Sequence, residues 1–304
     1  MRYLVTGGAG FIGSHICDRL LAEGHQVRIL DNFSTGKHEN IQASDHVEVV
    51  EGDVGDYDTV KSAMQDINMV FHEAAIASVP ETVGNPLASE RVNYRGTLNI
   101  LEAARHAGVQ RVMFACSAAV YGDLPELPKQ EGMPVRPLSP YAVDKLASEQ
   151  ACQMYTYLYG LETVSLRYFN VFGPRQDPSS PYSGVISIFT DYINQGKQPT
   201  IYGDGEQTRD FVYVSDVVEA NILASTSATA AGKALNVATI GTLSINDLLK
   251  TICNIKGALF EPEYKPGRDG DIKHSRADIS AAREHLGWQP VVGFEDGLRR
   301  LFES

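Results

Sequence analysis

Short apolar segments alternate with amphipathic segments along the first half of the chain, and this alternation constrains the fold more than any other feature. Strands separated by helix-length segments form βαβ units, whose parallel strands are apolar throughout because helices cover both faces of the sheet. We therefore predict an α/β fold with a doubly wound parallel sheet. The predicted strands are residues 2–6, 26–30, 47–50, 69–72, 112–116 and 163–168, and the predicted helices are 12–23, 86–107, 140–159, 244–255 and 294–302.

The character of the sequence changes after Gly173, where a segment rich in Pro, Ser and Gly indicates a loop that leads into a different region. A length of 304 residues is typical of roughly two domains. We expect the second domain to be smaller, of α/β type, and discontinuous in sequence. The expected division is a first domain over residues 1–172, rejoined by about 206–242, and a second over 173–205 and 243–304.

The chain is acidic, with 26 lysines and arginines against 38 aspartates and glutamates and a formal net charge of −12. This balance argues against nucleic acid as a partner, because a phosphate backbone is bound by a dense excess of cations. A small anionic ligand is compatible with it, because one helix N-terminus or one or two local cations suffice.

The cysteines give no sign of a metal site or of disulfides. Cys17, Cys116, Cys152 and Cys253 form no C-x-x-C pair, and their spacing matches neither a zinc site nor a disulfide framework. The N-terminus lacks a signal-peptide pattern, and apolar runs end well short of the roughly 20 residues that a membrane span needs. We expect a cytoplasmic protein with reduced thiols, no metal and no membrane association.

Gly7, Gly10 and Gly13 form a G-x-x-G-x-x-G turn between the first predicted strand and the first predicted helix. Glycines at these positions permit a tight turn, close approach of the backbone to a pyrophosphate, and packing of the helix against the sheet. The free N–H groups at the start of the helix then face the phosphates. The turn therefore predicts a dinucleotide site.

Asp31 ends the second predicted strand, 18 residues after Gly13. A carboxylate there accepts hydrogen bonds from the adenosine ribose and repels the additional phosphate of NADP, so we predict that the dinucleotide is NAD. Asp53, after the third strand, either reaches the adenine edge or forms a structural turn. His72 is assigned no chemistry.

Tyr141 and Lys145 are spaced i, i+4 at the start of a predicted helix and therefore share one face. A free tyrosine, with a pKa of about 10, is a poor base at neutral pH. The Lys145 ammonium and the positive ring of NAD⁺ are expected to lower that pKa. Ser117 ends the fifth strand, where ligands of such sheets collect. It is expected to hydrogen-bond the substrate oxygen from which Tyr141 takes a proton.

Several motifs resemble those of the extended short-chain dehydrogenases/reductases, within them the NAD-dependent epimerase/dehydratase family. Inside that family the chain is most similar to UDP-glucose and UDP-N-acetylglucosamine 4-epimerases, and the resemblance implies a Rossmann-like first domain and a nucleotide-sugar site in the second. The motifs are TGGAGFIG (6–13), SAAVYG (117–122), SPYAVDK (139–145), RYFNVFGP (167–174), FGPRQDP (172–178), YGDGEQTRDFVYV (202–214) and GRDGDIKHSRADIS (267–280).

The resemblance implies that one turnover inverts C4 of a UDP-hexose through a transient 4-keto sugar. Tyr141 takes the proton of the 4-hydroxyl while a hydride leaves C4 for NAD⁺, and the hydride returns to the other face of the sugar. Ser117 holds the reacting oxygen, and Lys145 binds the nicotinamide ribose. The contacts to the hexose must then be loose, so the nucleotide diphosphate supplies most of the binding energy.

The resemblance also implies the residues of both binding sites. For NAD they are Gly7, Gly10, Phe11, Ile12, Gly13, Asp31, Asn32, Ser34, Gly36, Asp53, Val54, Ala74, Ala75, Asn93, Tyr141, Lys145 and Tyr168. For the nucleotide sugar they are Ser117, Asn170, Val185, Tyr202, Arg209, Arg268, Asp271 and Ser275. Asn170, Arg209 and Arg268 match positions that contact the diphosphate, and Asp271 one near the uridine ribose.

Ser275 matches a position beside the hexose C2 substituent, where enzymes confined to UDP-glucose and UDP-galactose carry a bulky tyrosine. A serine implies room for an acetamido group, so we expect both UDP-Glc/UDP-Gal and UDP-GlcNAc/UDP-GalNAc as substrates. The alternative is that Ser275 begins a helix ahead of residues 276–278.

Other activities of the same family remain alternatives. The 4,6-dehydratases carry an acid pair where this chain has Ala118 and Ala119, and UDP-glucuronate decarboxylases carry a glutamate at position 119, so these activities are disfavoured, as is a net NADPH reductase by Asp31. A non-catalytic NAD sensor would lack part of the Ser–Tyr–Lys set. The family also implies a homodimer in which helices 86–107 and 140–159 pair as a four-helix bundle.

Overall fold

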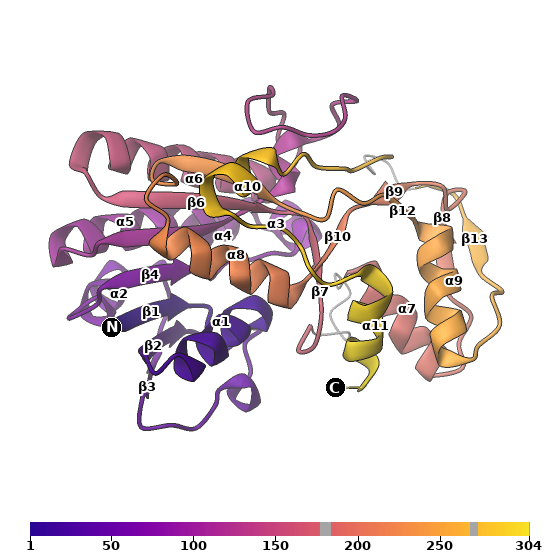
Figure 1. The fold of residues 1–304 in the computed structure, drawn as a ribbon, viewed down its shortest axis with the longest axis horizontal. Helices are drawn as coiled ribbons and strands as arrows, with labels where there is room; N and C mark the ends of the chain where they lie inside the picture. The colour runs from indigo at the N-terminus through magenta and orange to yellow at the C-terminus, as the bar shows by residue number, and fades with distance from the viewer. Residues whose placement is uncertain (177–183, 268–272, 304) are drawn as a thin grey trace.

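The computed structural model describes residues 1–176, 184–267 and 273–303, and its largest element is a seven-stranded, all-parallel sheet (Figure 1). The strand order is β11-β6-β5-β4-β1-β2-β3. The strands are β1 (Arg2–Thr6), β2 (Gln26–Asp31), β3 (Val47–Glu51), β4 (Met69–His72), β5 (Arg111–Ser117), β6 (Glu162–Tyr168) and β11 (Lys233–Val237).

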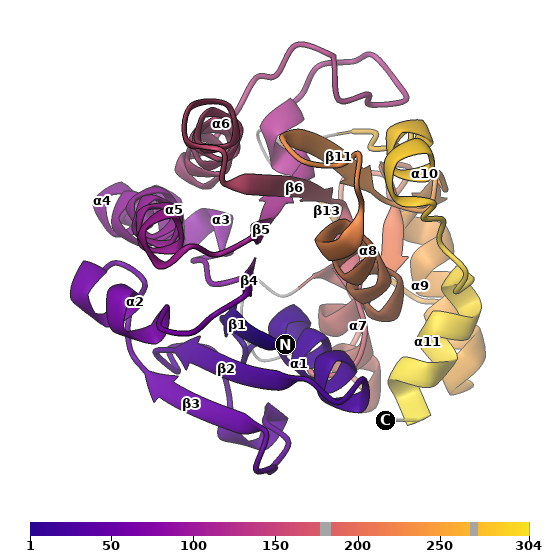
Figure 2. The same ribbon diagram turned by 60° about the vertical axis from the view of Figure 1, so that its left-hand side comes forward.

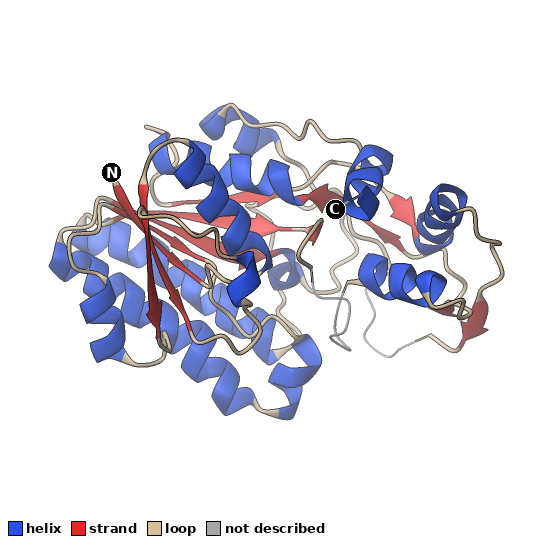
Figure 3. Cartoon of the chain, turned by 90° about the horizontal axis from the view of Figure 1, so that it is seen from below, coloured by secondary structure: helices blue, strands red, loops and turns tan. Residues whose placement is uncertain are grey.

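Helices cover both faces of this sheet, as the red strands between blue helices in Figure 3 show. Figure 2 shows α2, α5 and α6 over one face and α1 and α8 over the other. The doubly wound α/β prediction is therefore confirmed. These helices are α1 (Phe11–Ala22), α2 (Tyr57–Ala63), α5 (Gly96–Ala107), α6 (Pro140–Tyr159) and α8 (Val214–Thr226).

The strand order reverses between β1 and β4, because the chain first builds outward to β3 and then returns to the other side of β1. In sheets of this kind, the loops that leave the two strands on either side of the reversal diverge and open a crevice at their carboxyl ends. The glycine turn follows β1 and residues 73–75 follow β4, so the topology places them at this crevice.

The predicted continuous helix 86–107 is wrong in detail. It is divided into α4 (Pro86–Ser89), a π-helical segment η2 (Glu90–Arg95) and α5. Asn93 lies in the π-helical segment, and its side chain bonds both the N–H and the C=O of Ile76, at 2.8 and 3.1 Å. The wider π-helical turn occurs where Asn93 holds the loop after β4. The spacing of apolar residues along the helix does not predict this contact.

A smaller group of elements lies at one end of the large sheet (Figure 1). Its core is a separate cluster that includes Phe172, Phe189, Leu248 and Leu298. Its elements are the strand pairs β7 (Asn170–Phe172) with β10 (Phe211–Tyr213), β8 (Thr200–Tyr202) with β13 (Glu263–Lys265) and β9 (Thr208–Arg209) with β12 (Leu243–Ser244), and the helices α7 (Val185–Asn194), α9 (Ile245–Lys256) and α11 (Phe294–Glu303).

The remaining elements are short helices: α3 (Val79–Gly84), α10 (Ser280–Leu286), η1 (His38–Asn40) and η3 (Ala118–Tyr121). All four cysteines are buried free thiols. Within residues 1–176, 184–267 and 273–303, we find no helix whose length and apolar content would let it cross a membrane. In the same ranges, no group of three or more His, Cys, Asp or Glu side chains is placed to hold a metal ion.

Candidate active site

A cleft of about 410 Å³ opens at the crevice between β1 and β4. Most of the residues predicted to bind NAD line it, and Arg91, Glu73 and Ile76 line it without having been predicted. The predicted residues in its wall are Gly7, Gly10, Phe11, Ile12, Gly13, Asp31, Asn32, Ser34, Gly36, Asp53, Val54, Ala74 and Ala75.

The glycine turn has the geometry that a pyrophosphate requires. Gly7 has φ +68°, and a Cβ on it would lie 2.8 Å from the backbone nitrogen of Ala74. A Cβ on Gly13 would lie 2.2 Å from the Gly7 carbonyl oxygen. Gly10 caps α1 without a side-chain hydrogen bond, so the first N–H groups of the helix lack a side-chain acceptor there. These observations fit a phosphate-bearing dinucleotide.

Asp31 is held rigidly at the carboxyl end of β2. Its Oδ2 accepts a hydrogen bond from the Ala9 N–H and its Oδ1 from the Phe33 N–H, both at 2.9 Å. A Cβ on Gly36 would lie 2.8 Å from Oδ1, so the opposite loop approaches this carboxylate closely. A second phosphate at this point would meet a fixed negative charge.

We predict that Asp31 enforces selectivity for NAD. Because like charges at short range in a desolvated site repel strongly, the wild type should bind NAD at least a hundredfold more tightly than NADP. Asp31→Asn should reduce this preference at least tenfold in a calorimetric comparison of the two dissociation constants. Asp53→Asn, a change in the same cleft, is the matched control and should preserve the preference. Equal wild-type affinity for NAD and NADP would contradict the assignment.

Asp53 serves the turn and the cleft wall together. It accepts a hydrogen bond from the Gly55 N–H at 2.7 Å and pairs with Arg91 at 2.6 Å. Burial raises the pKa of Asp53, but the Arg91 guanidinium and the Gly55 N–H outweigh burial, so the pKa is lowered overall. Both alternatives left open by the sequence are thus compatible with its position.

The structure brings Ser117, Tyr141 and Lys145 together. Ser117 is the last residue of β5, and Ser139 caps α6 by accepting a hydrogen bond from the Ala142 N–H at 3.2 Å. Lys145 is buried, and its Nζ donates to the Ala115 carbonyl at 2.7 Å and lies 5.8 Å from the centroid of the Tyr141 ring. A side-chain hydrogen bond links Ser117 to Tyr141.

The protein residues alone do not lower the pKa of Tyr141. Burial raises the pKa of Tyr141 to about 12, and the hydrogen bond from Ser117 only partly offsets it. Burial also lowers the pKa of Lys145. The lowering expected from the sequence relies on two cations, Lys145 and the ring of bound NAD⁺, whereas in the protein alone the loss of water around the phenol dominates.

Of the residues predicted to bind NAD, Asn93, Tyr141, Lys145 and Tyr168 do not line the cleft described above. Asn93 is buried beneath the loop after β4, and Tyr168 is buried with its hydroxyl on the Glu73 carboxyl at 2.9 Å. His72 hydrogen-bonds Thr6 and Thr97 in the core, and burial lowers its pKa to about 3, so it is a neutral core histidine.

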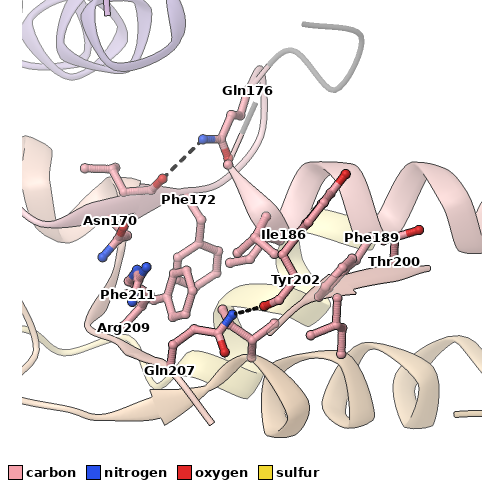
Figure 4. A pocket seen from close by; sticks show the side chains of 15 residues that line it. Asn170, Phe172, Gln176, Ile186, Phe189, Thr200, Tyr202, Gln207, Arg209 and Phe211 are labelled. Atoms are coloured by element: carbon pink, nitrogen blue, oxygen red, sulfur yellow. Dashed lines mark hydrogen bonds between the residues drawn. The ribbon is translucent and has the colours of Figure 1, made fainter. Parts of the chain in front are cut away.

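A second cavity, of about 250 Å³, lies among β7, β8, β9 and α7, and four residues predicted to bind the nucleotide sugar line it. They are Asn170, Val185, Tyr202 and Arg209. Figure 4 shows Asn170 and Arg209 at one end of this cavity and Phe189 and Thr200 at the other. The Gln207 side chain, which the sequence did not single out, donates to the Tyr202 carbonyl at 2.8 Å in the same wall.

Ser275 lies beside this cavity's arginine strand. Its N–H donates to the Thr208 carbonyl at 3.1 Å, one residue before Arg209. The next helix, α10, begins only at Ser280, so the alternative that Ser275 starts a helix is wrong. The predicted Arg268 and Asp271 lie outside the described residues.

A glycine-turn cleft, an aspartate at the end of the second strand and a Ser–Tyr–Lys set on a doubly wound sheet define the class of the short-chain dehydrogenases/reductases. The chain belongs to the NAD dependent epimerase/dehydratase family, whose model matches residues 3–238. Its cofactor is therefore NAD, and the glycine turn and Asp31 fit that group.

Individual relatives cover nearly the whole chain. It is 44% identical to the UDP-glucose 4-epimerase of Mycolicibacterium smegmatis, over 100% of this chain and 98% of that protein. The structure of Thermotoga maritima UDP-glucose 4-epimerase with UDP-glucose matches at TM-score 0.95 and 39% identity, covering 100% and 98% of the two chains. The UDP-N-acetylglucosamine 4-epimerase of Methanobrevibacter ruminantium, in complex with UDP-N-acetylmuramic acid, matches at TM-score 0.95 and 41% identity, covering 99% and 97%.

Proposed function

We propose that this protein is an isomerase that inverts C4 of UDP-hexoses. The observation that carries the proposal is the Ser117–Tyr141–Lys145 set at the carboxyl edge of the sheet. In the chain, Ser117 is followed by the uncharged residues Ala118 and Ala119. The relatives reported above, named UDP-glucose and UDP-N-acetylglucosamine 4-epimerases, support it.

Bound NAD⁺ supplies a hydride acceptor and, once reduced, the donor that returns the hydride. Tyr141 accepts the proton of the sugar 4-hydroxyl, and Ser117 holds the same oxygen by a hydrogen bond. Lys145 adds positive charge next to the phenol, at 5.8 Å from the ring centroid, and so favours the phenolate. After the 4-keto sugar turns over, Tyr141 returns the proton to the oxygen.

The second cavity is proposed to hold the diphosphate and the nucleoside. Arg209 offers a planar cation suited to bidentate phosphate contacts, and the Asn170 side chain, which donates to the Asp210 carbonyl at 2.9 Å, stands in the same wall. Arg268 and Asp271 remain proposed partners of the diphosphate and the ribose. Anchoring through the nucleotide leaves the hexose free to present either face.

Two related activities are the alternatives: dehydration of a dTDP-sugar and decarboxylation or epimerisation of UDP-glucuronate. Dehydration needs an acid–base pair beside the 4-keto sugar, and Ala118 and Ala119, in η3 directly after Ser117, cannot transfer protons. The proposal is tested by incubating the purified protein with a panel of UDP-hexoses and separating the products by chromatography. C4 epimers are expected. A 4-keto-6-deoxy sugar or a pentose as the main product would contradict the proposed C4 epimerisation.

We propose that the site for the hexose accepts N-acetyl sugars because Ser275 is small. Ser275→Tyr should lower kcat/KM at least tenfold for UDP-GlcNAc and UDP-GalNAc by steric exclusion, with little loss for UDP-glucose and UDP-galactose. Ser280→Tyr, at the exposed start of α10, is the matched control. Equal losses on both substrate pairs would show that Ser275 does not gate the pocket.

We also propose a cytoplasmic homodimer. Large apolar side chains are exposed on α3, α4 and α6, among them Val83 at 60%, Leu87 at 81% and Leu158 at 58% exposure. Their helices cover the same side of the sheet (Figure 2), and such exposed apolar side chains support helix pairing with a second copy. Sedimentation should give twice the mass of the chain, and a monomer at micromolar concentration would refute the dimer.

A further inference from the structure

One carboxyl in the wall of the NAD cleft has no part in the mechanism above. Glu73 follows β4 directly, on the side of the crevice opposite the glycine turn. A Cβ on Gly7 would come within 3.1 Å of the Glu73 carbonyl carbon, so the two loops are in close contact here. Glu73 therefore lies where the two walls of the cleft meet.

Groups from two further elements fix this carboxyl in place. The Tyr168 hydroxyl, at the end of β6, donates to Glu73 Oε1 at 2.9 Å, and Asn221 of α8 donates to the same hydroxyl at 2.7 Å. The Asn221 amide is itself tied to the Val217 carbonyl at 2.9 Å. A carboxylate that accepts from a buried, oriented hydroxyl is a preorganised charge.

Glu73 also interacts electrostatically with the catalytic set. The Lys145 ammonium acts on Glu73, and the charge of Glu73 acts on Tyr141. Tyr141 removes the proton from the oxygen whose carbon gives up the hydride, so the redox-active ring of the cofactor must lie beside Tyr141. Glu73 is thus a wall residue at the reactive end of the cleft.

We propose that the charge of Glu73 sets the balance between oxidised and reduced cofactor. The nicotinamide ring is positive in NAD⁺ and neutral in NADH, so a carboxylate beside it stabilises the oxidised form selectively. An epimerase must oxidise and reduce in each turnover, and this charge adjusts the two half-reactions against each other. The inference rests on the proposed role of Tyr141.

The titration of Glu73 makes this balance dependent on pH. Burial raises the pKa of Glu73 to about 7, while the Tyr168 hydroxyl and Lys145 act in the opposite direction. Lys145, Tyr141 and Tyr168 are the titratable groups that face it from α6 and β6. Above pH 7 the carboxylate is ionised and favours NAD⁺; below pH 7 it is neutral and the preference fades.

The test is the midpoint potential of the bound cofactor in the holoenzyme, measured against a redox dye at pH 6 and pH 8.5. Glu73→Gln keeps an acceptor for Tyr168 and removes the charge. At pH 8.5 it should shift the equilibrium about tenfold toward NADH, a rise of about 30 mV for two electrons, and at pH 6 the shift should shrink. Glu131→Gln is the control, since burial also raises the pKa of Glu131, outside this cleft.

A Glu73→Gln potential equal to wild type at both pH values, or the same shift in Glu131→Gln, would overturn the inference. If Glu73→Gln does not retain the cofactor, the pH dependence of the wild-type potential provides the test. The wild-type potential must then fall more steeply with pH than that of the free NAD couple, and an equal slope refutes the role. The potential is measured without a sugar. The Glu73 inference can therefore be refuted while the product panel still shows epimerisation.

Discussion

Replacing Tyr141 with phenylalanine is expected to lower kcat by about 10²–10⁴-fold, the usual contribution of a positioned general base. Only the phenol oxygen is removed, and this oxygen, which Ser117 bonds, is the atom that we propose accepts the substrate proton. The ring remains beside Lys145. NAD retention should therefore be nearly unchanged, which the cofactor content of the denatured protein measures.

Tyr155→Phe is the matched control for this experiment. Tyr155 lies on the same helix, but its hydroxyl donates to Glu102 at 2.9 Å, far along α6 from the catalytic set. Its kcat should remain within a few fold of wild type. A loss below about a hundredfold in Tyr141→Phe would mean that another group is the main base.

Replacing Arg167 with methionine is expected to lower the free energy of unfolding by about 3–5 kcal/mol, because it leaves a buried carboxylate without its cationic partner. Arg167 and Glu149 are both buried and form two hydrogen bonds, at 2.6 and 2.7 Å. Arg167 also donates to the Tyr121 hydroxyl at 2.8 Å. The pair joins β6 to α6, the helix that carries Tyr141 and Lys145.

Urea unfolding measures the loss in the free energy of unfolding, and two further variants serve as comparisons. Arg299→Met removes an exposed i, i+4 pair with Glu295, and it should cost less than about 1 kcal/mol. Adding Glu149→Leu to Arg167→Met should recover part of the stability, since no charge then remains buried. A loss below about 1 kcal/mol in Arg167→Met would show that Glu149 is solvated or neutral in the folded protein.

Local sequence patterns predicted what depends on local chemistry. The glycine turn and Asp31 are recognisable because steric limits at Gly7 and Gly13 and the position of a strand end are set within a few residues. The apolar runs likewise predicted β1–β6 and the parallel sheet. The seventh strand, β11, was missed because its segment KALNV, with a lysine and an asparagine, does not form a continuous apolar run.

What the sequence could not show depends on distant partners. Glu73 stands between a buried strand and two alanines, and its proposed role depends on Tyr168 and Asn221, which no spacing rule connects to it. The π-helical turn follows from the clamp between Asn93 and Ile76. The raised pKa of Tyr141 follows from the burial that the complete fold imposes on the phenol.

The most direct test of the central claim follows a deuterium atom placed at C4 of UDP-galactose through one turnover. If Tyr141 removes the hydroxyl proton while the hydride leaves and returns at C4, the product is UDP-glucose with the deuterium still on C4. The rate should also be slower than with the unlabelled sugar, because the labelled bond breaks. Loss of the deuterium to water, or its appearance on C6 as dehydration would require, would contradict C4 inversion by hydride return.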